Sequence, residues 1–290
     1  METRTPIRSI AVLGAGTMGR GIAQVAAMAG YAVRLYDLNE EILDRAMKHI
    51  ETTLDGGIRR GKVTEEEKKA TLSAIEPTAD FRHAVADADL VIEAAPEKLA
   101  LKQEIFRSLD RSCPSETILA TNTSSLSVKE IAEATRRPQA VLGMHFFNPP
   151  HIMKLVEVVR HDETAPEVVE VVLDVARRMK KEPIVVRDFP GFATSRLGVA
   201  LGLEAMRMVE QGVASVEDID RAMELGYNHP MGPLRLGDLV GLDVRLHIAE
   251  YLYEKLGSEV FRPPEILKRM VREGKLGKKT GQGFYRWEET

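Results

Sequence analysis

The sequence predicts an α/β fold, in which a doubly wound parallel sheet is followed by a smaller all-α domain. From residue 7 to about residue 188, short apolar runs alternate with amphipathic segments, and beyond that point only the helical pattern continues. Regular alternation of strands and helices is typical of a parallel sheet with helices on both faces. With 290 residues the chain has the length of two domains, which we place at 1–188 and 189–290.

The first predicted unit is a strand, a helix and a second strand. Residues 7–13 form an apolar run of buried-strand length, and 31–37 form another. Between them, 18–29 are mostly small residues, which let a helix pack closely on a sheet. This is the size of a βαβ unit, so the sheet begins as a parallel one.

A charged helical pair then interrupts the alternation over about 40–74. The Gly56-Gly57 pair predicts a break between its two helices, and Thr64 with Glu67 matches the capping box that starts a new helix. High charge is typical of a solvated surface, and a ligand-binding role is the alternative.

The alternation resumes and completes the first domain. The pattern predicts strands at 90–95, 117–120, 140–144, 155–159 and 184–186. It also predicts a helix at 98–109, a second helix that begins with a cap at 127–130, and a third that begins with a cap at 164–167. The second domain is predicted as helices at 192–212, 215–225, 233–256 and 264–273. Its first helix carries an apolar stripe that forms the core, a subunit interface, or both: Leu197, Val199, Leu201, Leu203, Met206 and Met208.

Composition excludes several classes of protein. The 44 acidic and 40 basic side chains give a net charge of -4, unlike a nucleic-acid-binding protein. No apolar run is long enough to span a bilayer. Cys113 is the only cysteine, so no intrachain disulfide can form. We therefore expect a cytoplasmic protein that binds neither nucleic acid nor membrane.

A glycine-rich turn marks a dinucleotide site. Gly14, Gly16 and Gly19 form a G-x-G-x-x-G motif between the first strand and its helix. Such glycines allow a tight turn, close approach of backbone amides to a pyrophosphate, and close helix packing. Asp37 follows Gly19 by 18 residues and would bind ribose hydroxyls while repelling a 2′-phosphate. The motif predicts a Rossmann-type domain that binds NAD rather than NADP.

Further residues complete the predicted cofactor site. The carboxyl ends of parallel strands meet at one crevice, so segments 93–97 and 120–125 are expected to face the nicotinamide ribose. The predicted site therefore also includes Thr17 and Met18 of the glycine turn, and Asn122.

One histidine is the candidate for acid–base chemistry. His145 follows the predicted 140–144 strand, and with an ordinary pKa of about 6.5 it can accept and return a proton near neutral pH. Glu157, in the next strand, would fix the histidine tautomer and stabilise its cation. Ser124 would bind a substrate oxygen or cap a helix. The simpler interpretations are a histidine with satisfied hydrogen bonds at a strand end and a glutamate that points outward from an edge strand.

No metal site is predicted. His145, His151 and His161 lie in separate segments, and no H-E-x-x-H spacing occurs. His151, directly after two prolines, is expected to be a solvated loop residue.

A series of motifs resembles the 3-hydroxyacyl-CoA dehydrogenase family, which includes the 3-hydroxybutyryl-CoA dehydrogenases. The motifs span nearly the whole chain: Gly14 to Gly19, Asn122-Thr-Ser-Ser, His145-Phe-Phe-Asn-Pro-Pro, Pro190-Gly-Phe, His229-Pro-Met-Gly-Pro and Lys279-Thr-Gly-Gln-Gly-Phe-Tyr. The resemblance implies an NAD-binding Rossmann domain and a helical domain that forms a homodimer. It also implies oxidation of an L-3-hydroxyacyl-CoA to the 3-oxoacyl-CoA, the reverse reaction, and a place in fatty acid β-oxidation.

The same resemblance assigns roles to individual residues. It implies that His145 is the base, that Glu157 is its partner and that Ser124 contacts the substrate hydroxyl. Glu97 and Lys102 fall where the family contacts the nicotinamide end of NAD. The charged helical pair falls where the CoA tail lies.

Position 195 departs from the family pattern. The family has P-G-F-x-x-N-R, whereas the segment here ends in Ser195 and Arg196. Ser195 and Asn148 both fall among the substrate-binding positions. A serine can donate one hydrogen bond but lacks the amide pair of asparagine, so the substrate carbonyl is expected to be held differently.

Two other functions fit parts of the pattern. An NAD-dependent sugar-acid dehydrogenase of the L-gulonate dehydrogenase type shares the cofactor site, and a nucleotide-binding sensor or structural protein would keep the fold without the chemistry. Phe146, Phe147 and the charged helical pair favour an acyl-CoA substrate. The acid–base pair favours an enzyme.

Overall fold

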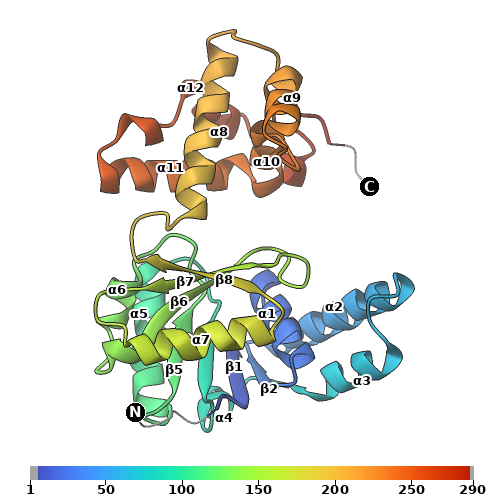
Figure 1. The fold of residues 1–290 in the computed structure, drawn as a ribbon, viewed down its shortest axis with the longest axis vertical. Coiled ribbons are helices and arrows are strands. Elements are labelled where there is room, and N and C mark those ends of the chain that lie inside the picture. The colour runs from blue at the N-terminus through green and yellow to red at the C-terminus, as the bar shows by residue number, and fades with distance from the viewer. Residues whose placement is uncertain (1–5, 288–290) are drawn as a thin grey trace. The chain divides into compact units, whose positions relative to one another are not determined.

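The computed structural model describes residues 6–287. Its internal contacts divide the chain into two units, Met1–Phe189 and Pro190–Thr290 (Figure 1). The first unit is built around a sheet, and the second is helical. The predicted α/β class with a following all-α domain is therefore confirmed.

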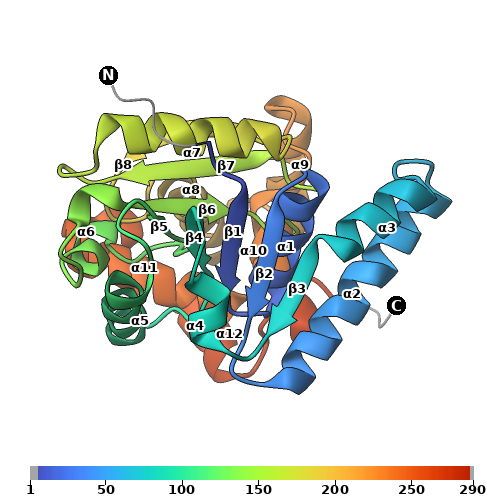
Figure 2. The same ribbon diagram turned by 90° about the horizontal axis from the view of Figure 1, so that it is seen from below.

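The sheet of the first unit has eight strands in the order β3-β2-β1-β4-β5-β6-β7-β8 (Figure 2). The strands are β1 Ser9–Leu13, β2 Ala32–Tyr36, β3 Ile75–Thr78, β4 Leu90–Glu93, β5 Ile118–Thr121, β6 Val141–Phe146, β7 Leu155–Arg160 and β8 Glu182–Arg187. Neighbouring strands are parallel except β6 and β7, which are antiparallel. The segment 147–154 between them contains no helix, and a parallel crossover needs a longer connection.

Helices cover both faces of this sheet. They are α1 Thr17–Met28, α2 Glu40–Arg59, α3 Glu65–Ser73, α4 Phe81–Val85, α5 Leu99–Ser112, α6 Val128–Ala132 and α7 Pro166–Arg178, with a 3-10 turn at Pro138–Ala140. Ile22 of α1 and Val172 of α7 belong to one apolar core with the sheet. On the other face, a Cβ added to Gly143 in β6 would lie 3.2 Å from the Val128 side chain of α6.

Some local predictions for this unit are confirmed and others are wrong. The capping box of Thr64 and Glu67 forms as predicted, and Ser127 caps α6. The break predicted near Gly56-Gly57 lies slightly later in the chain, because α2 continues through both glycines to Arg59 and α3 begins at Glu65. A Cβ on Gly57 would lie 2.7 Å from the Val63 side chain, so this glycine provides close packing rather than a helix end.

Two further details differ from the prediction. Strand β3 and helix α4 were not predicted, since β3 is short and contains a proline. The expected side-chain cap of α7 is also wrong. Thr164 instead donates to the Val141 carbonyl at 3.0 Å, and Ala165 precedes the helix without a side-chain cap.

The second unit is a bundle of short helices. They are α8 Thr194–Glu210, α9 Val216–Gly226, α10 Pro233–Val240, α11 Leu242–Leu256 and α12 Glu265–Arg272, with 3-10 turns at Glu259–Phe261 and Lys278–Thr280. The single helix predicted at 233–256 is wrong, because Gly241 adopts a φ of 107° and separates α10 from α11. Asp238 is fully buried and accepts hydrogen bonds from Phe284 N and Tyr285 N, which ties down the chain after α12.

The predicted apolar stripe of α8 divides into two groups. Val199, Leu203 and Met206 are buried in the core of the second unit, so the core interpretation is confirmed for them. Leu197 is 72% exposed. No helix within residues 6–287 has the length and apolar character to cross a bilayer.

Candidate active site and its relatives

The glycine turn joins β1 to α1 with very close backbone contacts. Gly14 has a φ of 98°, and a Cβ there would lie 2.8 Å from the Ala94 carbonyl oxygen. A Cβ on Gly19 would lie 1.6 Å from the Gly14 oxygen. Gly16 differs, because a Cβ there would meet nothing within 4 Å. The turn therefore packs tightly on the sheet side and leaves space in front of Gly16.

The start of α1 fits a bound pyrophosphate. Gly16 is the N-cap, no side chain caps the helix, and its first turn contains no acidic residue. Thr17 is exposed and Met18 half-buried at this end of the helix. Unpaired amides at a helix N-terminus attract phosphate groups. Asp37, just beyond β2, accepts a hydrogen bond from Ala15 N at 2.8 Å, which places its carboxylate beside the turn. These residues fit NAD.

Two glycine substitutions separate packing from cofactor binding. Gly19→Ala forces the backbone apart, and we expect it to lower the free energy of unfolding by about 3 kcal/mol. Gly16→Ala has room for its methyl group and a φ of -66°, so its stability should change by less than about 1 kcal/mol. We expect this methyl group to weaken NADH binding by about tenfold or more, because it stands where the pyrophosphate approaches. Urea unfolding and NADH titration measure the two effects. Similar losses of stability in both variants would contradict this assignment.

Lys102 lies in a buried ion-pair network. Its side chain is 1% exposed, and Nζ donates to Glu93 Oε1 at 2.7 Å and to the Ala95 carbonyl at 3.2 Å. Glu97 Oε2 lies 3.5 Å from the same nitrogen. An ammonium group has three donors, and these acceptors use them. Lys102 therefore contacts Glu97 directly, and any influence on the nicotinamide end passes through that carboxylate. This role of Glu93 was not predicted from the sequence, although an acid that ends an apolar strand is a visible signal.

Glu97 holds the loop that contains Ser124. Its Oε1 accepts hydrogen bonds from Thr123 Oγ1 at 2.6 Å, Ser124 N at 2.8 Å, Ser124 Oγ at 3.2 Å and Ser125 N at 3.2 Å. Burial raises the pKa of Glu97, but the Lys102 charge and the hydrogen bonds outweigh it and leave that pKa below its ordinary value. The helix α6 is capped by Ser127, so the capping alternative for Ser124 is wrong.

Asn122 joins this loop to β6. Its Oδ1 accepts a hydrogen bond from Phe146 N at 2.9 Å. This side-chain oxygen holds the Ser124 loop beside the strand that carries His145, and the cofactor role of Asn122 stays a prediction.

His145 and Glu157 form a buried pair across β6 and β7. The two residues are direct partners in the antiparallel register, and His145 Nδ1 lies 2.7 Å from Glu157 Oε2. His145 is 7% exposed and Glu157 is fully buried. The outward-facing interpretation of Glu157 is therefore wrong. His145 lies within β6 rather than after it, and shares the α6 face with Gly143.

The segment after His145 is held by packing and by a buried lysine. Pro150 packs on α1, since a Cβ on Gly21 would lie 2.7 Å from its ring. Lys181 donates to the carbonyls of Pro150 and Met153. Asn148, a predicted substrate residue, is exposed in this segment. Ser195, the other one, lies in the first turn of α8 in the second unit and is half-buried.

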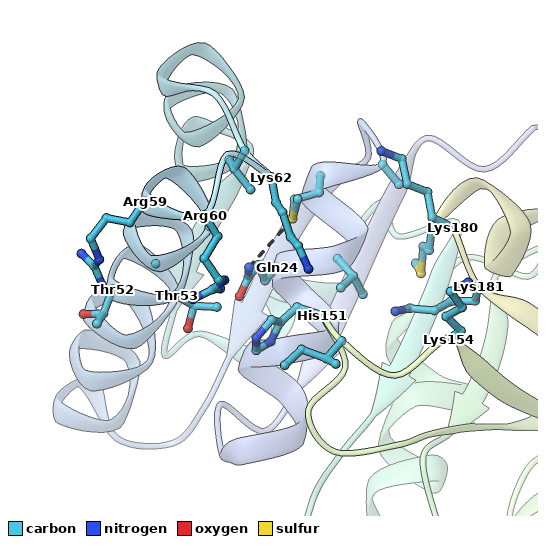
Figure 3. Close-up of a pocket in the computed structure, with 18 of the residues that line it drawn as sticks. Gln24, Thr52, Thr53, Arg59, Arg60, Lys62, His151, Lys154, Lys180 and Lys181 are labelled. Atoms are coloured by element: carbon cyan, nitrogen blue, oxygen red, sulfur yellow. Dashed lines mark hydrogen bonds between the residues drawn. The ribbon is translucent and has the colours of Figure 1, made fainter. Parts of the chain in front are cut away.

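A basic cleft of about 690 Å³ opens in the first unit between the helical pair and the start of β8. In Figure 3, Arg60 and Lys62 extend from the helical pair toward Gln24 and His151, and Lys181 lies on the other side of the cleft. No acidic side chain is among its lining residues. The cleft is therefore suited to a polyanion.

His151 lies in the turn before β7, as predicted for a loop residue, and its half-buried side chain lines this cleft. Burial lowers the pKa of His151, and the nearby positive charges of Lys181 and Arg60 lower it further. Within residues 6–287 no cluster of three or more His, Cys, Asp or Glu side chains could hold a metal ion.

Comparison with known proteins shows relatives along the whole length. Residues 9–189 match the NAD-binding domain of 3-hydroxyacyl-CoA dehydrogenase, and residues 191–287 match its C-terminal domain. A probable 3-hydroxybutyryl-CoA dehydrogenase of Bacillus subtilis is 48% identical over 98% of each chain. The mitochondrial hydroxyacyl-coenzyme A dehydrogenase of Sus scrofa is 42% identical over 97% of this chain and 92% of its own.

Solved structures give the same result. The (S)-3-hydroxybutyryl-CoA dehydrogenase PaaH1 of Ralstonia eutropha superposes with a TM-score of 0.94 at 38% identity, covering 98% of this chain and all of the other. The predicted resemblance, the NAD cofactor and the dehydrogenase class are thereby confirmed. The chain belongs to the 3-hydroxyacyl-CoA dehydrogenase family and carries that family's NAD-binding domain.

Proposed function

We propose that this chain oxidises L-3-hydroxyacyl-CoA substrates, such as 3-hydroxybutyryl-CoA, to the 3-oxoacyl-CoA with NAD, and catalyses the reverse reduction. The observation that carries the proposal is the buried pair of His145 and Glu157, 2.7 Å apart. Oxidation of a secondary alcohol needs a base for the hydroxyl proton and a group that stabilises the protonated base. The names of the B. subtilis and R. eutropha relatives support the substrate class.

The protein's part in this reaction is proton transfer and orientation. His145 takes the hydroxyl proton on Nε2, because Nδ1 faces Glu157, and returns it in the reverse direction. Glu157 fixes the ring orientation and stabilises the imidazolium. Bound NAD supplies the acceptor for the hydride that leaves the carbinol carbon. Ser124, held by Glu97, contacts the substrate hydroxyl, and Asn148 contacts the rest of the acyl thioester. The role of Ser195, in the second unit, stays a prediction.

The basic cleft is the proposed site of the CoA phosphates. It is lined by seven lysine and arginine residues and lies along the helical pair: Arg59, Arg60, Lys62, Lys154, Arg178, Lys180 and Lys181. CoA carries several phosphate charges, and guanidinium groups bind phosphate through paired donors. A sugar acid has no phosphate and would leave these charges unused.

The second unit supports a proposed homodimer. Several of its large apolar side chains are strongly exposed, including Leu197 at 72%, Leu225 at 74% and Tyr227 at 76%. Exposed apolar side chains of this kind are typical of a protein interface.

A direct assay separates the proposed function from its alternative. With NAD, we expect 3-hydroxybutyryl-CoA to be oxidised with a kcat/KM at least about 10²-fold above that for L-gulonate, because only the former uses the cleft. Preference for L-gulonate would establish a sugar-acid dehydrogenase. NADH binding without turnover of either substrate would establish a binding protein.

Charge reversal tests the position of CoA. In the Arg60→Glu/Lys62→Glu variant we expect the KM for acetoacetyl-CoA to rise by about tenfold or more, because two phosphate contacts become repulsive. The acetoacetyl thioester of N-acetylcysteamine lacks phosphates and should be reduced as well by the variant as by the parent. Lys69→Glu, an exposed lysine that does not line the cleft, is the matched control. Equal losses with both substrates would place CoA elsewhere.

A further inference from the structure

The imidazole of His151 lies among the cationic side chains of the basic cleft. His151 is half-buried in the turn before β7, and it lines the cleft together with Arg60 and Lys181. Arg60 and Lys62 extend toward it from the helical pair (Figure 3). Within residues 6–287 no hydrogen bond or ion pair forms to its ring. Both ring nitrogens are therefore available to a ligand in the cleft.

Gln24 on α1 is a second polar group of the same cleft. Its side chain is 4% exposed, and within the described chain its amide makes one weak hydrogen bond, from Nε2 to Met28 Sδ at 3.8 Å (Figure 3). A side-chain amide has two donor protons and an acceptor oxygen, and a buried amide without strong partners costs free energy. Gln24 and His151 therefore offer hydrogen bonds to a ligand, beside the fixed charges of lysine and arginine.

The charged groups around His151 are all basic. Burial lowers the pKa of His151 most, and the positive charges of His49, Lys181 and Arg60 lower it further. His49, on α2, itself lies close to the charge of Arg20 on α1. The remaining charged side chains that line the cleft are also cations: Arg59, Lys62, Lys154, Arg178 and Lys180. His151 is therefore held in its neutral form near pH 7 when no anion is bound.

We propose that His151 binds a phosphate group of CoA as an imidazolium, and that it takes up a proton from solution when CoA enters the cleft. This inference rests on the proposed position of the CoA phosphates. A negative charge within about 4–6 Å of an imidazole favours its charged form. The imidazolium donates from both nitrogens, and a hydrogen bond between charged groups is about twice as strong as a neutral one.

His49 is the other histidine that a proton could reach. It is exposed on α2 and does not line the cleft, whereas His151 does. We therefore assign the contact with phosphate to His151.

Proton uptake makes the affinity for CoA depend on pH. The pKa of His151 lies below its ordinary value of about 6.5 in the free protein, and a bound phosphate raises it. Between these two values the complex holds more protons than the free protein, so affinity falls as pH rises. Above the higher value and below the lower one, this contribution to the pH dependence disappears.

Calorimetry with CoA tests the proposal. Titration of the full chain in buffers of different ionisation enthalpy gives the number of protons taken up for each CoA bound. At pH 7 we expect the wild type to take up about 0.5 proton more than His151→Gln. Between pH 6 and 8 its affinity should fall about tenfold more than that of the variant. The titration of the CoA phosphates cancels in this comparison, because both proteins receive the same ligand.

A fixed charge at the same position makes the test specific. His151→Lys supplies a cation that does not titrate near neutral pH, so at pH 8 it should bind CoA at least about threefold more tightly than His151→Gln. It should show no proton uptake beyond that of His151→Gln. The matched control is His83→Gln, because His83 is exposed on α4, bonds to Glu76 and does not line the cleft. This control should keep the wild-type uptake.

NADH binding shows that each variant is folded, and its Kd should be the same in all of them at each pH. The proposal is overturned if His151→Gln takes up as many protons as the wild type. An uptake that is lost in His49→Gln and kept in His151→Gln would assign the proton to His49 instead.

The Arg60→Glu/Lys62→Glu variant separates this inference from the proposed function. If that variant weakens CoA binding but no uptake depends on His151, the cleft remains the CoA site and only the inference is removed. If it binds CoA like the wild type, both the proposed position of CoA and the inference are wrong. These measurements need no turnover, so a failed dehydrogenase assay leaves their result unchanged.

Discussion

Replacing His145 with alanine is expected to lower kcat/KM for acetoacetyl-CoA by about 10³–10⁴-fold. The imidazole is the group that we assign to move the proton of the substrate hydroxyl, and Glu157 is already positioned to stabilise its cation. A water molecule that took over as the base would be neither oriented nor stabilised by Glu157, so it would restore little of the lost rate. The measurement is steady-state kinetics with NADH in both directions.

A second variant of His145 distinguishes a loss of catalysis from a loss of folding. His145→Ala leaves the buried Glu157 carboxylate without its partner, which destabilises the sheet. His145→Gln keeps a donor for that carboxylate but cannot act as a base, so it should fold normally and show the same kinetic loss. His161 is the matched control, because it is 3% exposed and its ring nitrogens bond to the Pro138 carbonyl and to Glu163 N. His161→Gln should affect stability more than turnover. Activity of His145→Gln within tenfold of wild type would remove His145 from the mechanism.

Sequence patterns predicted most of the structural features that depend on residues close together in the chain. The glycine turn, the capping box of Thr64 and Glu67 and the long periodic helices are read directly from neighbouring residues. The errors occur where tertiary packing decides. Gly57 permits contact with Val63 inside a continuous helix, whereas Gly241 does end one, and both glycines look alike in sequence.

In the candidate site, too, contacts between neighbouring elements were predicted and contacts that depend on tertiary packing were not. His145 and Glu157 are found from sequence because they lie in consecutive strands, and the antiparallel register makes them direct partners. Lys102 was assigned by resemblance to the cofactor. The structure places its ammonium in a buried network with Glu93 at the end of β4, a contact that no local sequence pattern predicts. The basic cleft collects cations from segments more than a hundred residues apart, such as Arg60 and Lys181, and no local pattern joins them.

Replacing Glu157 with glutamine is the second variant with a large expected effect. An amide of the same shape can still contact His145 Nδ1, but it carries no charge to stabilise the imidazolium. We expect kcat to fall by about 10²–10³-fold. Glu157 is fully buried and acts through His145, so the KM for acetoacetyl-CoA should change by less than about threefold.

Stability measurements make this second test specific. Removing a buried charge at constant shape is expected to change the free energy of unfolding by less than about 1 kcal/mol, so activity and stability should separate. Glu157→Asp retains the charge at a shorter reach and should recover part of the lost kcat. Glu170, an exposed glutamate on α7, is the matched control, and Glu170→Gln should show wild-type kinetics. If Glu157→Gln loses stability in proportion to activity, or if Glu157→Asp recovers nothing, the glutamate supports the sheet rather than the base.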